Sequence, residues 1–66
     1  MKPIGAITAL ALLRLVRVGC LFRRIEIDQM CAESLVRREF AAWDSEVRWV
    51  LHPTPSGIEH AKLWGL

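Results

Sequence analysis

Hydrophobic residues recur at helical spacing through the first third of the chain. One stripe with this spacing comprises Ile4, Ile7, Ala11, Leu15 and Val18. Pro3 and Gly19 flank the segment, and these residue types are favoured where a helix starts and ends, respectively. Further leucines lie on the other sides of the same helical wheel. The pattern therefore predicts a helix over residues 4–18 that is central in the fold or lies at an oligomer interface.

The second clear pattern is an alternation of apolar and polar residues near the C-terminal end. Residues 46–51 (EVRWVL) alternate over most of their length and are rich in β-forming residues, so they predict a strand. His52-Pro53 ends this strand. Thr54 is then placed as an N-cap with Pro55 at the first helical position, which predicts a short helix that ends by Gly65.

The middle of the chain allows two interpretations. Residues 28–43 contain no Gly or Pro, and Ala32, Val36, Phe40 and Trp43 share one helical face, which favours a single long helix. This interpretation gives a mostly α-helical chain with one strand.

The second interpretation places a helix at 21–33, a strand at 35–40 and a hairpin turn at 41–45. It provides the strand at 46–51 with a neighbour, and a lone strand is not stable. We therefore predict a small α+β fold in the order helix, helix, hairpin, helix. The predicted core comprises Ile7, Ala11, Leu15, Val36, Val47, Trp49, Ile58 and Leu63. Trp43 is the tryptophan that we expect to be most exposed.

Composition adds an expectation about assembly. The 66 residues form a single domain, 1–66, and 53% of them are hydrophobic, which is more than so short a chain easily buries. We therefore expect a homo-oligomer or a tight partner. The uncharged N-terminal run ends at Arg14, too early for a membrane span or a signal peptide, so a cytoplasmic protein without a membrane partner is expected. Cys20 and Cys31 are interpreted as small buried hydrophobic residues.

Charge is unevenly distributed, although the net charge is only +2. Residues 1–24 contain five basic and no acidic residues, whereas residues 25–66 contain four basic and seven acidic ones. The first segment is thus +5 and the second −3. Such an asymmetry can orient a molecule toward a polyanion or toward an acidic protein surface.

Three segments occur in a suggestive order: 35–39 (LVRRE), 47–51 (VRWVL) and 54–57 (TPSG). Over residues 34–61 this order resembles the end of winged-helix DNA-binding regulators. The resemblance implies paired helices at 4–18 and 21–33, joined by Gly19-Cys20, ahead of a β-hairpin wing. The chain departs from the family where Ser34 replaces a usual glycine and where Arg23 replaces an apolar anchor. It also has no room for a further N-terminal helix.

Two functions from different classes follow. In the first, the protein is a small transcriptional regulator that binds duplex DNA, with Arg23 and Arg24 at the groove or phosphates. The wing would then contact the DNA backbone through Arg37, Arg38 and Arg48. In the second, a phage-type interaction protein inhibits or adapts a larger protein, which contacts Trp43, Asp44 and Glu46.

Catalytic and metal-binding chemistry is not indicated. Two cysteines and two histidines are separated by 11, 21 and 8 residues, which fits no close-paired zinc ligand set. The four glycines are scattered, so they form no phosphate-binding loop. We therefore expect a non-enzymatic protein without a cofactor.

Overall fold

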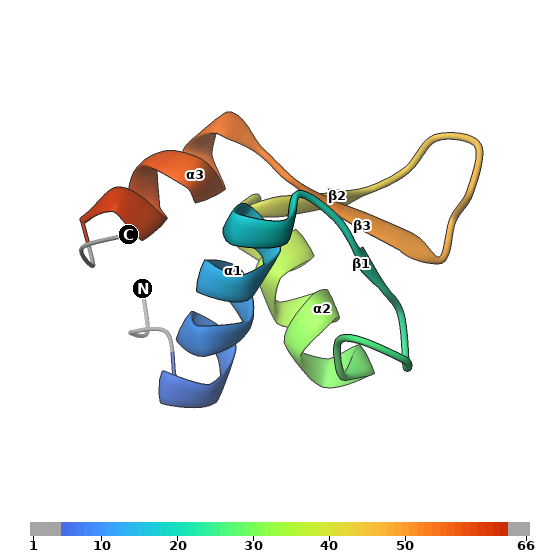
Figure 1. Ribbon diagram of the computed structural model, residues 1–66, viewed down its shortest axis with the longest axis horizontal. Helices are drawn as coiled ribbons and strands as arrows, with labels where there is room; N and C mark the ends of the chain where they lie inside the picture. Colours follow the sequence, from blue (N-terminus) through green and yellow to red (C-terminus); the bar gives the residue numbers. More distant parts are fainter. Residues whose placement is uncertain (1–4, 64–66) are drawn as a thin grey trace.

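The computed structural model describes residues 5–63, which form a three-helix α+β domain with a three-stranded sheet (Figure 1). Its elements are α1 (Ala6–Val18), β1 (Leu21–Phe22), α2 (Gln29–Arg37), β2 (Ala41–Trp43), β3 (Val50–Pro53) and α3 (Pro55–Lys62). The predicted fold class is confirmed, and so is the order helix, helix, hairpin, helix, to which β1 is added. Among residues 5–63, no helix combines the length and apolar character needed to cross a membrane.

The sheet has the strand order β1-β3-β2, and both pairs are antiparallel. Leu51 on the central strand pairs with Leu21 on one side and with Trp43 on the other. Helices α1 and α2 pack against each other and against the sheet, while the link between β2 and β3 projects beyond them (Figure 1). The alternative of a mostly α-helical chain with one strand is therefore wrong.

Helix α1 ends where the sequence pattern predicts, but its buried face is not the predicted stripe, since Ile7 and Val18 are exposed. Gly19 ends it with a φ of 100°, a left-handed conformation that favours glycine, and its N–H donates to the carbonyl of Leu15 at 2.8 Å. Leu12 and Leu15 on the inner side of the helix are fully buried. The predicted helix at 4–18 is confirmed for its described part; Pro3 and Ile4 lie outside the described residues.

The core is built from aliphatic side chains alone. Among residues 5–63, the buried hydrophobic side chains are Leu12, Leu15, Leu21, Ile27, Ala32, Leu35, Ala41, Leu51 and Ala61. Of the predicted core, Leu15 is buried, whereas Ala11, Val36, Val47 and Ile58 are half-buried. The prediction is wrong for Ile7, Trp49 and Leu63, which are 76%, 57% and 77% exposed. Cys20 and Cys31 are half-buried free thiols.

The middle of the chain differs from both interpretations of its sequence. Residues 21–33 are not one helix, because β1 and a turn occupy 21–27, where Arg24 has a φ of 68°. Asp28 then caps α2 by accepting a hydrogen bond from the N–H of Met30 at 3.0 Å. A helix over 28–43 is also wrong beyond Arg37, since Glu39 takes a φ of 63° and turns the chain toward β2.

The hairpin exists, but it is displaced along the sequence. The first half of the strand predicted at 35–40 belongs to α2 and the second half to the turn that follows it, and the predicted turn at 41–45 contains β2. The strand predicted at 46–51 begins only at Val50. Residues 44–49 form the link instead, because the carboxylate of Asp44 accepts hydrogen bonds from two N–H groups within it.

Helix α3 begins as predicted and is anchored by its first turn. The hydroxyl of Thr54 accepts from the N–H of Gly57 at 3.1 Å and donates to the carbonyl of Glu39 at 2.6 Å. Gly57 lies so close to Phe40 that a Cβ atom there would overlap the carbonyl oxygen of Phe40. The ring of Phe40 also stacks on His60, with centroids 4.5 Å apart. These contacts fix α3 against the turn that follows α2.

Candidate nucleic-acid interface

An open pocket lies where the sheet meets the link of the hairpin. It has a volume of about 420 Å³ and is lined by Arg23, Trp43, Asp44, Ser45 and Arg48. We call it the hairpin-end pocket. Arg23 follows β1, Trp43 ends β2, and Arg48 lies in the link that precedes β3. The strand order β1-β3-β2 therefore brings residues that are 25 positions apart in the sequence to one end of the sheet.

Arg23 is held in place by its backbone and by its side chain. Its N–H donates to the carbonyl of Trp49 at 2.8 Å, which extends the pairing of β1 with the hairpin. Its guanidinium carbon lies 5.7 Å from the centre of the Trp43 ring, within cation–π range. A guanidinium over a ring face keeps donors at its edge, so Arg23 can still donate to an anion in the pocket.

Asp44 shapes the link that carries Arg48. One carboxylate oxygen accepts from the N–H groups of Val47 at 2.9 Å and Glu46 at 3.0 Å. The other lies 3.0 Å from Nε2 of His52 on β3. The N–H of Val47, then that of Glu46, and finally His52 lower the pKa of Asp44 below its ordinary value. This carboxylate thus has a structural role as a cap of the link.

Arg24 follows Arg23 in sequence but does not line the pocket. Its N–H donates to the carbonyl of Ile27 at 2.8 Å, and its Nε donates to the side-chain oxygen of Gln29 at 3.2 Å. Gln29 in turn donates to Glu33 at 2.9 Å. Arg24 is therefore directed toward the start of α2. It does not stand on a recognition-type helix, as the winged-helix resemblance implied, because residues 21–27 are not helical.

Arg37 and Arg38 also lie away from the pocket. Arg37 ends α2 and Arg38 is the C-cap of that helix, so neither residue is in the hairpin. The expectation that both contact DNA from a wing is wrong in its placement, because the segment predicted as a strand at 35–40 is the end of α2 and the turn after it. Of the three arginines assigned to the wing, Arg48 is the one that the hairpin carries.

The residues expected to bind a protein partner fall in the same place. Trp43 and Asp44 line the hairpin-end pocket, and Glu46 is exposed in the adjoining link. Trp43 was expected to be the exposed indole, but it is half-buried against the core, and Trp49 is exposed instead. Residues from both predicted sites, the DNA-binding one and the protein-binding one, therefore line the same pocket.

Sequence reasoning missed Ser45 as a lining residue and Trp49 as an exposed aromatic. The signal for both was Asp44-Ser45, which is typical of a turn start and argues for placing the strand after residue 49. Within residues 5–63, no group of three or more His, Cys, Asp or Glu residues is arranged to hold a metal ion. Comparisons of the chain with protein-family models, curated proteins and solved structures found no match.

Proposed function

We propose that the protein is a small cytoplasmic regulator that binds duplex DNA with its hairpin end. The observation that carries this proposal is the convergence of Arg23 and Arg48 on one open pocket. Guanidinium groups are planar and always charged, and they donate in a fork that matches phosphate oxygens. The pocket is therefore suited to one or two phosphates of a nucleic-acid backbone.

The electrostatics of the pocket agree with an anionic ligand. Asp44 is the one acidic residue that lines it, and both oxygens of that carboxylate are already engaged by N–H groups and His52. Arg23 is ordered by Trp43 before any ligand arrives, which lowers the entropy cost of binding. Arg23 and Arg48 therefore give the open pocket a positive charge that a ligand can reach from solvent.

The fold adds support at a coarser level. Within residues 34–61, the hairpin and the Thr-Pro helix start agree with the winged-helix resemblance, whereas the first strand lies at 41–43 and not at 35–40. The projecting link would serve as the wing. A single helix, α2, lies between β1 and the hairpin, and its exposed residues include Met30, Glu33 and Arg37. We propose that groove contacts come from this helix. Specific recognition by this helix is part of the proposal.

The small number of basic contacts sets the expected strength. Each phosphate neutralised contributes a slope of about −0.9 to log K against log salt. Two contacts, from Arg23 and Arg48, predict a slope of about −1.8 by that rule. Binding is then moderate and fades as salt is raised.

Fluorescence anisotropy with a labelled duplex, measured over a series of salt concentrations, tests the proposal. Arg48→Gln should weaken binding and reduce the magnitude of the salt slope by about 0.9, and Arg23→Gln should do the same. Lys62→Gln is the matched control, because it removes one charge from the exposed end of α3. Absence of binding by the wild type at low salt, or equal losses in all three variants, would overturn the proposal.

A second candidate function is binding to a larger protein, and it is favoured by Trp49 and Glu46, which are both exposed in the link. An indole that is 57% exposed on a projecting link is typical of an interface anchor. Capture from a lysate treated with nuclease separates the two functions. A single stoichiometric protein that is retained by the wild type and lost with Trp49→Ala, together with no duplex binding, would establish this candidate in place of the first.

A further inference from the structure

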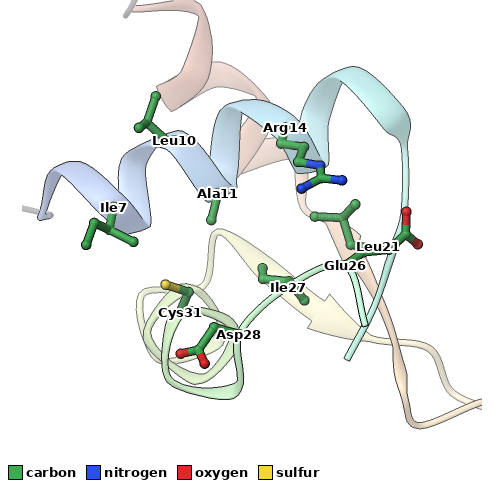
Figure 2. A pocket seen from close by; sticks show the side chains of 9 residues that line it. All are labelled: Ile7, Leu10, Ala11, Arg14, Leu21, Glu26, Ile27, Asp28 and Cys31. Atoms are coloured by element: carbon green, nitrogen blue, oxygen red, sulfur yellow. The ribbon is translucent and has the colours of Figure 1, made fainter. Parts of the chain in front are cut away.

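The outer side of α1 is an exposed surface that the proposed DNA site does not use. Ile7, Leu10, Arg14 and Arg17 follow one another at intervals of three or four residues and so share one helix face. Ile7 is 76% and Leu10 is 66% exposed, and both arginines are exposed. We call these four residues the α1 outer face. Figure 2 shows Leu10 projecting from the helix and Ile7 beside the start of α2.

Leu10 and Arg14 form a ridge between two hollows. The first hollow, of about 470 Å³, is lined by Leu10, Arg14, Arg17 and Val18. The second, of about 230 Å³, lies between α1 and the start of α2 (Figure 2). Its floor is apolar and includes Ala11, Leu21, Ile27 and Cys31. A ridge beside a groove on one helix is the geometry by which two helices interlock.

The two hollows carry opposite charge. The first is bordered by Arg14 and Arg17, and α1 contains no acidic residue. The second is bordered by Glu26 and Asp28 in addition to Arg14. Among residues 5–63, no ion pair joins Arg14 or Arg17 to a described acidic side chain. Basic side chains (Arg14 and Arg17) and acidic side chains (Glu26 and Asp28) thus border neighbouring hollows without forming an ion pair with each other.

From this arrangement we infer that the α1 outer face binds a second copy of the chain, with the two α1 helices antiparallel. A two-fold axis between Leu10 and Arg14 places Leu10 of one copy opposite Arg14 of the other. It also places Ile7 opposite Arg17. The arginine stems then cover the leucine and isoleucine side chains, and Arg14 reaches toward Glu26 and Asp28 across the axis.

The occupant is a second copy because the surface is complementary to itself. A two-fold interface uses the same patch on both partners, so each patch must hold both halves of every contact. The α1 outer face and the second hollow together contain the ridge of Leu10 and Arg14, an apolar floor, and an acidic border formed by Glu26 and Asp28. Burial of Ile7 and Leu10 in the dimer also removes apolar surface that the monomer leaves in water.

Sedimentation equilibrium of the full chain, from micromolar to millimolar concentration, measures the expected dimer. Arg14→Glu and Glu26→Lys each place like charges across the axis and should weaken self-association by about tenfold or more. An equimolar mixture of these two variants should recover association, because each contact in the mixed dimer again joins opposite charges. Lys62→Glu, a charge reversal at the exposed end of α3, should leave association unchanged.

Leu10→Lys provides a test that does not depend on Glu26, whose carboxylate accepts from the N–H of Phe22 at 3.2 Å. It replaces the apolar side chain of the ridge at an exposed position. The variant should be a monomer whose circular dichroism matches that of the wild type. A monomeric wild type would overturn the inference. It would also be overturned if Leu10→Lys dimerised normally, or if the variant mixture associated no better than its components. These outcomes are independent of DNA binding, which the Arg48→Gln series measures separately.

Discussion

The hairpin end and the α1 outer face are two exposed regions built in contrasting ways. At the hairpin end, a carboxylate caps the link, an arginine lies over an indole, and backbone hydrogen bonds join β1 to the hairpin. On α1, the exposed side chains have no such contacts: Ile7 and Leu10 project from a regular helix. The first region is fixed by directional bonds, and the second is defined by exposed apolar area.

This difference is the basis for proposing a different kind of partner for each region. Ordered donors around an open pocket select charge and geometry, which suits phosphate groups. Exposed apolar side chains on a helix favour a partner with a complementary apolar surface, such as another helix. The two proposals, DNA binding at the hairpin end and self-association along α1, therefore use separate surfaces of the chain. Variants that act on one region and spare the other test this separation.

The largest effect should come from Gly57, which holds the base of the hairpin against α3. Gly57→Ala places a methyl group on the carbonyl oxygen of Phe40, and main-chain atoms cannot rotate away as a side chain can. We expect a loss of about 4 kcal/mol in the free energy of unfolding, near the upper end for a point mutation. Urea denaturation followed by circular dichroism measures it. Ser56→Ala, at the exposed neighbouring position, is the control.

A stability of Gly57→Ala within experimental error of the wild type would contradict the close packing of α3 on Phe40. An intermediate loss, confined to signals from α3 in backbone chemical shifts, would mean that α3 undocks locally while the hairpin persists. Either result would show that the stability of the hairpin does not depend on the packing of α3 against Phe40.

The next effect compares the two sides of α1. Leu15→Ala removes a fully buried side chain from the core and should cost about 3 kcal/mol, as Leu→Ala changes in cores do. Leu10→Ala makes the same chemical change on the outer face and should alter monomer stability by less than about 0.5 kcal/mol. Thermal melts at low protein concentration measure both. Equal losses of stability in Leu15→Ala and Leu10→Ala would contradict the exposure of Leu10 in the monomer.

The smallest effect concerns the charge of Asp44 at the hairpin end. Its pKa is lowered from 3.8 by the N–H groups of Val47 and Glu46 and by His52. A carboxyl with a depressed folded pKa stabilises the fold above its ordinary pKa, and this contribution is lost as the pH falls through the folded value. Asp44→Asn should therefore be less stable than the wild type at neutral pH, and the difference should shrink on acidification.

Urea midpoints of both proteins, measured from neutral to strongly acidic pH, follow this difference. Glu59→Gln, which removes an exposed carboxylate from α3, is the matched control. A difference that grows on acidification would reverse the sign and exclude the capping role of the Asp44 carboxylate.

The sequence predicted the elements whose ends carry strong local signals. Gly19 marked the end of α1, and Thr54 with Pro55 marked the start of α3. The middle was misplaced because two turns depend on left-handed residues that are not glycine, Arg24 and Glu39. Local hydrogen bonds to Ile27 and Gln29 accompany the turn at Arg24, and a hydrogen bond from Thr54 reaches the carbonyl of Glu39. The apolar periodicity of the sequence indicates neither turn. Asp28, an N-cap residue type, was the signal that could have placed α2.

The candidate site was predicted in part. The winged-helix resemblance predicted Arg23 near the start of a recognition-type helix and Arg48 in a wing; the fold instead brings both to one pocket. Arg37 and Arg38 were misassigned because their segment was predicted as a strand. Trp43 and Trp49 exchanged their expected exposures because the alternation of residues 46–51 assumed a strand, whereas Asp44 folds residues 44–49 into a link. Alternation predicts burial only where the chain is extended.

The placement of the indoles gives the molecule a spectroscopic property. Trp43 and Trp49 both belong to the hairpin, and the core of residues 5–63 contains no fully buried aromatic ring. The emission of exposed Trp49 consequently follows the order of the link, and that of Trp43 follows the end of the sheet where it packs against the core. Because the guanidinium of Arg23 lies over the Trp43 ring, an anion that draws that group away changes the surroundings of a fluorophore. The protein thus carries an intrinsic optical probe at the pocket proposed to contact phosphate.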